Sequence, residues 1–332
     1  MPITSEVATL PIIGRDEADV KKTSENNKMS DAVVADFDRS IRHTALKGRA
    51  SKGASALKTL GAGVDVPVAV IMRNDLTQLE IMSAAARAGT VIVALNWHAA
   101  ADEVAAICDD SGARFVIIHR DLIAPLRPAL NGRTVIGVTP APALCAAYDI
   151  SAEDAAADPE TQEWNALVDA QDPIKNREMM RPLMRYTSGS TGAPKGVRRL
   201  GGGPRKDFED ILRRVGTDML RLRPGSRFFT AAPIYHSAPS TLTSAALATP
   251  DVSTYLAPKF EPEQFLATIE ALNITHIYLV PTMMSRLLKL PDSVKAQYDV
   301  SSVEFCVSTG SPWPHDLKVA MIDWWGPVFR ES

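Results

Sequence analysis

The stretch RYTSGSTGAPKGVRR, residues 185–199, places glycines and hydroxyl-bearing residues directly after an apolar run. Its glycines let the backbone turn tightly and approach a ligand closely. The backbone amides and hydroxyls between Thr187 and Thr191 can donate hydrogen bonds to phosphate oxygens, and Lys195 adds a mobile positive charge. The pattern therefore predicts a loop that binds a polyphosphate.

Better-known glycine motifs do not fit this spacing. A Walker A loop needs Ser or Thr directly after its lysine, whereas Lys195 lies between Pro194 and Gly196. The dinucleotide pattern G-x-G-x-x-G fails because GAGVDV, residues 61–66, lacks the third glycine. The run GSTG, residues 189–192, lacks the G-x-S-x-G spacing of a nucleophile elbow. An ordinary Gly/Ser surface loop is the alternative, but a pattern with fixed Gly, Pro and Lys positions is far more specific.

The composition is that of an ordinary globular protein. The chain has 332 residues, of which 45% are hydrophobic, and its 36 basic and 39 acidic residues give a net charge of −3. This balance offers no electrostatic case for binding nucleic acid or an anionic membrane. Cys108, Cys145 and Cys306 form no CxxC pair, and the histidines show no metal-ligand spacing. Neither a disulfide framework nor a metal site is predicted.

No segment of the sequence predicts secretion or membrane insertion. The N-terminus has no basic segment followed by an apolar core, as a signal peptide would have. No uninterrupted apolar run approaches the roughly 20 residues that span a bilayer. We therefore expect a cytoplasmic protein without an integral membrane segment.

Apolar, β-branched runs alternate with helical patterns along most of the chain. Such alternation predicts mostly parallel sheets with helices on both faces. Residues 1–30 are uneven, and the stretch KKTSENNKMSD, residues 21–31, is polar and weakly periodic, so we expect a loosely attached or disordered leader over 1–30. An Ala-, Pro- and Asp-rich excursion places a boundary near residue 180, so we expect one α/β subdomain over 31–180 and a second over 181–332. The strand-like runs lie at 66–72, 90–95, 114–119, 134–138, 183–188, 227–233, 252–258, 274–281 and 303–310.

The segment YTSGSTGAPKGV, residues 186–197, resembles the signature loop of the AMP-forming adenylate enzymes. These include acyl-CoA synthetases, aryl-CoA ligases, luciferases and peptide-synthetase adenylation domains. Residues 85–117 resemble the family's early βαβ segment, APIYHSAPS at 232–240 its acyl-pocket segment, and STGSPWP at 308–314 its adenine-side turn. The resemblance implies the large N-terminal domain of the acyl-CoA synthetase-like fold, with two stacked αβα subdomains.

The resemblance also implies a two-step reaction and the residues that serve it. A carboxylate attacks the α-phosphate of Mg²⁺-bound ATP, and coenzyme A then takes the acyl group and releases AMP. Lys195 would assist the first step, and Gly310, Ser311 and Pro312 would line the adenine. The β- and γ-phosphates would be held by Thr187, Ser188, Gly189, Ser190, Thr191, Gly192 and Lys195.

His236 is the second catalytic candidate. By resemblance, it borders the acyl pocket and gates or orients the carboxylate; a hydrogen-bonded structural histidine is the alternative. Relatives that activate amino acids carry an aspartate in this segment, whereas Tyr235-His236-Ser237 offers no carboxylate. We therefore expect a small-molecule carboxylic acid with an apolar tail, and the acceptor is coenzyme A or a carrier protein.

The end of the sequence predicts a partial ligase. In the relatives, a segment like WWGPVFRE, residues 324–331, is followed almost at once by a YGxTE motif whose glutamate helps bind Mg-ATP. Ser332 comes first here, and Glu331 precedes that motif, so the third subdomain and the C-terminal domain would be missing. We expect negligible thioester formation by this chain alone. The alternatives are a non-catalytic nucleotide- or acyl-binding remnant, and half of a split enzyme completed by a separate C-terminal polypeptide.

Overall fold

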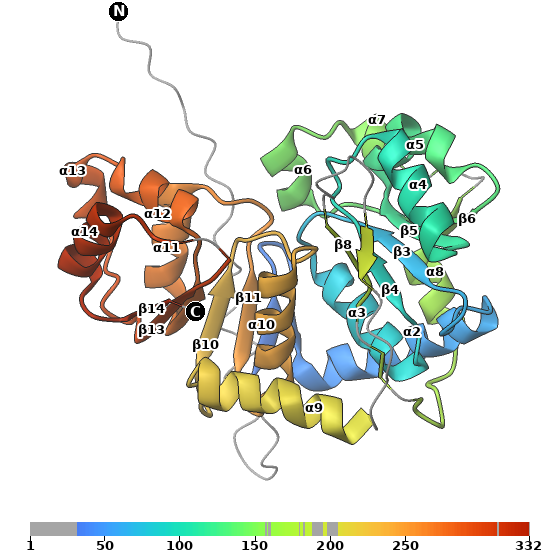
Figure 1. The fold of residues 1–332 in the computed structure, drawn as a ribbon, viewed down its shortest axis with the longest axis horizontal. Helices are drawn as coiled ribbons and strands as arrows, with labels where there is room; N and C mark the ends of the chain where they lie inside the picture. The colour runs from blue at the N-terminus through green and yellow to red at the C-terminus, as the bar shows by residue number, and fades with distance from the viewer. Residues whose placement is uncertain are drawn as a thin grey trace, which may run out of the picture.

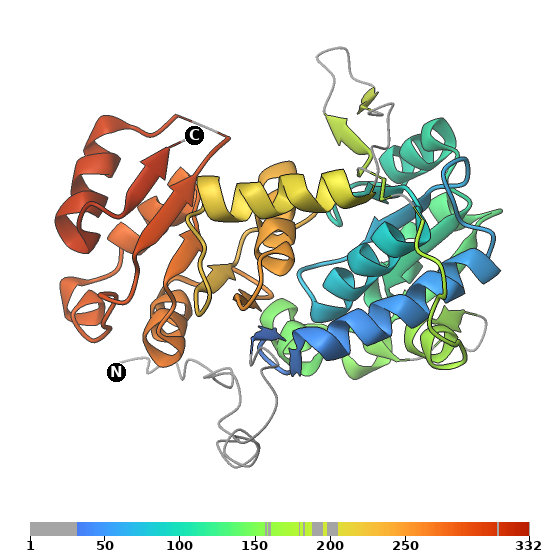
Figure 2. The ribbon, with the colours of Figure 1, turned by 90° about the horizontal axis from the view of Figure 1, so that it is seen from below.

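The molecule is built around two large β-sheets that have helices on their faces (Figures 1 and 2). The structure is a computed structural model, and it describes residues 32–156, 158, 161–178, 180, 181, 183–187, 195–197, 205–310 and 312–331. Within these residues, one sheet has five strands, a second has seven, and a small hairpin has two. Figure 2 shows the two larger sheets side by side, with helix α9 (Arg205–Arg214) running along both.

The five-stranded sheet is parallel throughout, in the order β4-β3-β5-β6-β7. Its strands alternate their side chains between two apolar layers. Val68 and Val70 pack with Leu57, Ile81 and Trp164 on one face, while Ala69 and Ile71 pack on the other. The strands are β3 (Val68–Ile71), β4 (Ile92–Ala94), β5 (Phe115–His119), β6 (Thr134–Val138) and β7 (Gln162–Glu163). The helices are α2 (His43–Thr59), α3 (Leu76–Ala88), α4 (Ala101–Ser111), η1 (Arg120–Leu122), α5 (Ile123–Leu130), α6 (Pro142–Tyr148), α7 (Ala152–Ala155) and α8 (Trp164–Asp169).

The seven-stranded sheet has the order β14-β13-β12-β10-β11-β1-β2, and all its pairs are parallel except β1–β2. Stacked Phe229 and Phe265 rings, 4.7 Å apart, lie in its core. The strands are β1 (Val33–Ala35), β2 (Ser40–Arg42), β10 (Arg227–Thr230), β11 (Ser253–Leu256), β12 (His276–Tyr278), β13 (Phe305–Ser308) and β14 (Phe329–Glu331). Its other elements are π-helical η2 (Val215–Met219), α10 (Ser237–Ala248), α11 (Pro262–Leu272), α12 (Pro281–Leu288), α13 (Asp292–Lys295) and α14 (His315–Trp325).

Strands β1 and β2 precede the five-stranded sheet in the sequence but belong to the seven-stranded sheet. Val34 of β1 pairs with Thr254 of β11, although the residues between them include the whole five-stranded sheet. Strands β1 and β2 thus lie on the far side of the division expected near residue 180, and that division stays a prediction.

The parallel α/β architecture expected from the sequence is confirmed, and glycines end two of its helices. Gly89 and Gly112 follow α3 and α4 in the left-handed conformation, with φ of 68° and 74°, which glycine adopts without strain. Helix α3 also begins with a side-chain N-cap. Asp75 is the cap, and its carboxylate accepts a hydrogen bond from the Thr77 amide at 2.6 Å.

Candidate active site

The carboxyl edge of the seven-stranded sheet brings two predicted segments to one side of the molecule. The segment with His236 follows β10, and the turn with Gly310 and Pro312 follows β13. Strand β12 lies between those strands, and all three are parallel. The Tyr278 hydroxyl donates to the Thr309 carbonyl at 3.4 Å, which ties β12 to the second turn. Ligands of open parallel sheets bind at this edge.

The predicted phosphate loop connects the two strands of the small hairpin. Strand β8 (Arg185–Thr187) pairs antiparallel with β9 (Lys195–Val197), and Thr187 faces Lys195 across the ladder. The structure therefore holds the two ends of the loop together. The predicted binding residues Ser188, Gly189, Ser190, Thr191 and Gly192 lie outside the described residues, as do the side chains of Thr187 and Lys195.

Gly196 is required by the packing of this hairpin. A Cβ atom there would lie 2.8 Å from both Met184 Cε and Tyr186 Cζ, closer than real side chains approach. The Tyr186 hydroxyl in turn donates to Asp110 Oδ2 at 2.5 Å, which fastens the hairpin to the end of α4. Glycine at this position thus leaves room for the Met184 and Tyr186 side chains.

Arg185 connects the hairpin to the segment that carries His236. Its Nη2 donates to the Ser237 carbonyl at 3.3 Å and to Thr241 Oγ1 at 3.2 Å, both in the first turns of α10. Strand β8 and the start of α10 are therefore held together by one side chain. No sequence motif marks Arg185 for this role.

His236 is the residue immediately before α10, with extended backbone angles of φ −73° and ψ 155°. Its ring packs against the Tyr235 ring with 4.3 Å between centroids. Desolvation of part of the ring lowers the pKa of His236 below its usual 6.5, which favours the neutral imidazole at pH 7. The positive end of the α10 dipole lies at the same place, so the site combines a neutral hydrogen-bonding ring with a field that favours an anion.

Asn74 holds the backbone that leads to His236. It lies just after β3 of the other sheet, and its Nδ2 donates to the carbonyls of Ala232 and Ala257, each at 3.0 Å. Its Oδ1 accepts from the Ile234 amide at 2.9 Å. One buried amide thus joins the carboxyl ends of both sheets. Its contacts could not be foreseen from a lone asparagine after an apolar run.

A buried ionic cluster lies beside Asn74. Asp75 Oδ1 and Asp36 Oδ2 both accept from Arg39 Nη2, at 2.7 and 2.6 Å. His119 Nε2 lies 3.6 Å from Asp75 Oδ2. Burial opposes ionisation of Asp75, but interactions with His119 and Arg39 outweigh it and lower the pKa of that carboxyl. The cluster joins the β1–β2 connection to the start of α3.

The turn after β13 is held by Glu331 on the neighbouring strand β14. Gly310 has φ of 94°, a conformation that favours glycine. Glu331 Oε1 accepts from the Trp313 amide at 3.2 Å, while its Oε2 pairs with Lys318 Nζ at 2.6 Å. Pro312 directly precedes Trp313 in this turn, whereas Ser311 lies outside the described residues. Glu331 therefore braces the predicted adenine turn through its backbone.

Comparison with known protein families gives a match over nearly the whole chain. A model of the AMP-binding enzymes matches residues 20–330. The chain belongs to the AMP-binding enzyme family.

Its curated relatives in this family include several CoA ligases. The chain is 29% identical over 283 residues to a feruloyl-CoA synthase of Amycolatopsis, a match that covers 85% of the chain and 52% of the relative. An indoleacetate–CoA ligase of Aromatoleum aromaticum is 26% identical over 277 residues, covering 82% and 51% of the two chains. The chain thus spans about half the length of these relatives.

Solved structures confirm the fold. An anthranilate CoA ligase in complex with anthranoyl-AMP superposes with a TM-score of 0.73 and 22% identity, covering 90% of this chain and 55% of that one. An acyl-CoA synthetase of Brucella canis gives a TM-score of 0.74 at 18% identity, with 91% and 54% covered. Within the residues that the structure describes, no helix combines the length and apolarity needed to cross a membrane.

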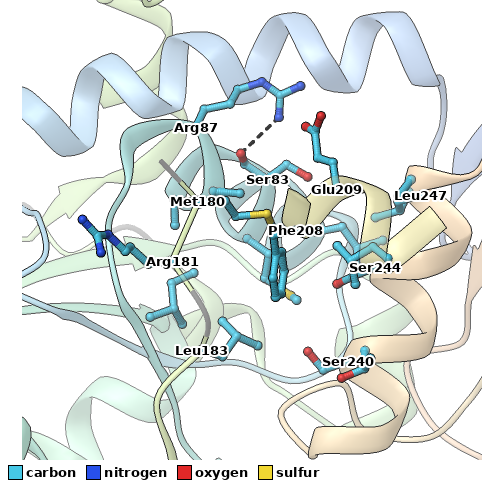
Figure 3. Close-up of a pocket in the computed structure, with 18 of the residues that line it drawn as sticks. Ser83, Arg87, Met180, Arg181, Leu183, Phe208, Glu209, Ser240, Ser244 and Leu247 are labelled. Atoms are coloured by element: carbon cyan, nitrogen blue, oxygen red, sulfur yellow. Dashed lines mark hydrogen bonds between the residues drawn. The ribbon is translucent and has the colours of Figure 1, made fainter. Parts of the chain in front are cut away.

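A cavity of about 410 Å³ lies between α3 and α10 (Figure 3). Ser83 and Arg87 of α3 line one side, and Ser240 and Ser244 of α10 line the other. Its volume falls in the range of roughly 300–1,000 Å³ that is typical of small-molecule sites. Arg185 lines it as well, so the cavity borders the hairpin that carries the phosphate loop.

His43, at the start of α2, also lines the cavity and predicts a pH-dependent stability. Desolvation and the charge of Lys47 lower the pKa of His43 to about 4 from 6.5, against a smaller opposing effect of Asp251. Between these pH values the unfolded chain binds more protons than the folded one, so stability falls on acidification. We expect His43 to account for a loss of about 2 kcal/mol between pH 7 and pH 5.

The measurement is urea unfolding at both pH values, for the chain and for His43→Leu. The leucine variant should lose less stability on acidification, by about 2 kcal/mol. Part of the slope should remain, because burial also lowers the pKa values of His236 and His276. His315→Leu, at an exposed position, serves as the control. An unchanged slope in His43→Leu would contradict the assignment.

Proposed function

We propose that this chain forms the acid- and nucleotide-binding part of an AMP-forming acid–CoA ligase. The main support is the clamp by which Arg185 holds the predicted phosphate hairpin to the start of α10, directly beside His236. A carboxylate at His236 and a triphosphate at the hairpin would then be neighbours. Holding two reactants in place lowers the barrier to their reaction.

In the proposed first step, a carboxylate oxygen of the acid attacks the α-phosphorus of ATP. The bond from that phosphorus to the bridging oxygen breaks, and pyrophosphate leaves with the bonding electrons. In the second step the thiolate of coenzyme A attacks the acyl carbon, and AMP leaves. Charge neutralisation and positioning are the protein's main contributions to phosphoryl chemistry.

The residues serve these steps as follows. Lys195 and the loop residues hold the β- and γ-phosphates, and then the departing pyrophosphate. Neutral His236 donates a hydrogen bond that orients the carboxylate, while the α10 N-terminus favours its negative charge. Gly310, Ser311 and Pro312 border the adenine, on the turn that Glu331 braces.

Mg²⁺ would reach the site with ATP. Among the described residues, no three His, Cys, Asp or Glu side chains are grouped so that they could hold a metal ion. Mg²⁺ commonly keeps several waters and binds through substrate phosphates with one or two carboxylates. The described part of the chain offers no ready-made metal site, and no step above depends on one.

The acid is expected to have a largely apolar tail. The Tyr235-His236-Ser237 segment carries no carboxylate that could pair with a substrate ammonium group. The feruloyl and indoleacetate ligases named above act on aromatic acids, which agrees with an uncharged skeleton.

Lys195→Ala is the direct test of the phosphate loop. A lysine hydrogen-bonded to phosphate contributes on the order of 1.5–3 kcal/mol, so we expect ATP to bind at least about tenfold more weakly. AMP, which lacks the β- and γ-phosphates, should bind nearly as before. Calorimetric titration of both nucleotides measures this, with Lys52→Ala, at a distant position on α2, as the control. Equal losses for ATP and AMP would contradict the assigned role.

The complete reaction is expected to need more than this chain provides, because the relatives are about twice as long. We expect the 332-residue chain to bind nucleotide but to form acyl-CoA negligibly. Acid-dependent exchange of labelled pyrophosphate into ATP tests the first step, and thioester formation tests the second. Rapid thioester formation by the chain alone would contradict the expectation.

A further inference from the structure

Strand β8 contacts helices of both large sheets through two neighbouring side chains. Successive residues of a strand point to opposite sides. Tyr186 reaches α4, beside the five-stranded sheet, where its hydroxyl donates to Asp110 Oδ2. Arg185 reaches α10, beside the seven-stranded sheet, where it donates to the Ser237 carbonyl and to Thr241 Oγ1. The strand that leads into the predicted phosphate loop is thus tied to each sheet's helices by a different side chain.

The first turn of α10 has little support of its own. His236 lies at the capping position, but among the described residues its side chain makes no capping hydrogen bond. The Ser240 amide donates to the His236 carbonyl at 3.1 Å, while Pro239 has no amide hydrogen to donate. Helix ends open more readily than helix interiors. The hydrogen bonds from Arg185 therefore stabilise a turn that would otherwise open easily.

The same turn is the place where the function proposed above puts the carboxylate, and the inference rests on that function. The positive end of the α10 dipole acts on an anion only while the first turn is helical, because its strength falls off within that turn. An ordered turn therefore favours a bound carboxylate, and an open turn does not. The affinity for the acid should follow the order of this turn.

The predicted phosphate loop lies at the other end of the same connection. It joins β8 to β9, and the residue two positions after Arg185, Thr187, faces Lys195 across the ladder. ATP held at the loop would fix the end of β8 and keep the Arg185 guanidinium within reach of α10. A ligand that favours one of two arrangements shifts the equilibrium toward that arrangement.

We propose that Arg185 is a positioning residue that makes ATP and the acid bind cooperatively. ATP at the hairpin orders the first turn of α10 through Arg185, and the ordered turn binds the carboxylate more tightly. The acid strengthens ATP binding by the same factor, because coupling between two binding sites is reciprocal. We expect a factor of about ten, which lies within the usual range for coupled sites.

The sign of the coupling separates this route from direct contact between the two ligands. Mg-bound ATP and the ionised acid both carry negative charge, so direct repulsion would make each weaken the binding of the other. Positive cooperativity therefore needs a contribution from the protein. The hydrogen bonds of Arg185 to α10 supply that contribution.

Hydrogen exchange measures the first half of the coupling without any acid. At saturating concentration, α,β-methylene-ATP with Mg²⁺ should slow amide exchange over residues 237–244 by about tenfold. This analogue cannot lose pyrophosphate, so no adenylate forms. Arg185→Met keeps an unbranched side chain without the hydrogen bonds and should abolish the protection. Arg185→Lys keeps a charged donor and should restore part of it.

Calorimetric titration measures the second half. Ferulate, indoleacetate and decanoate serve as probes, each titrated with and without the saturating analogue. In the wild-type chain the analogue should raise the affinity of the tightest probe by about tenfold, and in Arg185→Met by less than about twofold. Thr241→Val removes one of the two acceptors and should give an intermediate gain. A general loss of structure would weaken acid binding with and without the analogue, whereas the ratio reports the coupling.

Arg214→Met, at an exposed position of α9, is the matched control and should keep both the protection and the gain. Melting curves establish that all variants fold. Protection or a gain that survives unchanged in Arg185→Met would overturn the inference, and so would the absence of both in the wild-type chain. Weaker ATP binding by Lys195→Ala would then leave the proposed function standing. If Lys195→Ala binds ATP unchanged and no acid binds, the proposed function fails together with the inference.

Discussion

Asn74→Leu is expected to destabilise the folded chain by at least about 3 kcal/mol, because it leaves buried backbone groups without partners. The amide of Asn74 satisfies the carbonyls of Ala232 and Ala257 and the amide of Ile234. Each buried polar group that loses its partner costs about 1–3 kcal/mol. Leucine is similar in size but can make none of these bonds.

Asn74→Asp sharpens this test, since it preserves the shape of the side chain. A carboxylate can still accept from the Ile234 amide, but it presents an oxygen to two carbonyls where Nδ2 had donated. We expect a loss of at least about 2 kcal/mol in urea unfolding, with weaker acid binding, because the backbone before His236 shifts. Asn176→Leu, at an exposed position, is the control. Stability within the error of the wild-type chain would show that the amide does not make these bonds.

Asp75→Ala is expected to cost about 2–4 kcal/mol, since it removes a buried carboxylate that caps α3 and accepts a hydrogen bond from the partly exposed Arg39. Arg39 would keep Asp36 as a partner, but the Thr77 amide would lose its cap. The pKa of Asp75 is lowered in the folded chain, so its contribution is present at pH 7 and is lost only as the pH falls below the unfolded value near 3.9.

Urea unfolding at pH 7 measures this cost, with Asp323→Ala on the exposed face of α14 as the matched control. The double variant Asp75→Ala/Arg39→Met separates the ion pair from the other contacts of each residue. It should be less destabilised than the sum of the two single variants. Strict additivity would show that the two charges do not stabilise one another in the folded chain.

Much of the fold could be predicted because its strands are short apolar runs between helical patterns. The runs at 114–119 and 134–138, for example, became the adjacent parallel strands β5 and β6. The strands at 33–42 could not be assigned to a sheet. Runs as short as VVA and SIR carry no sign of their partner, and their pairing is decided by tertiary contacts with β11.

The site was partly predictable for a similar reason. His236 and Gly310 follow apolar strands, and parallel strands bring such segments to one edge. Arg185 and Asn74 carry no motif, since each acts through partners that are distant in sequence. The roles of the loop residues and of Ser311 stay predictions.

The early position of β1 in the chain has a consequence during synthesis. The Val33 amide donates to Ser253 Oγ, 220 residues later. At roughly 5–20 residues per second, a ribosome needs about 10–40 s to make the intervening segment. During that time the edge of β1 that pairs with β11 has no partner strand. Unpaired strand edges can pair with other chains, so we expect the nascent chain to be prone to aggregation at this stage. Strand β1, the first among the described residues, can thus complete its pairing only after β11 has been made.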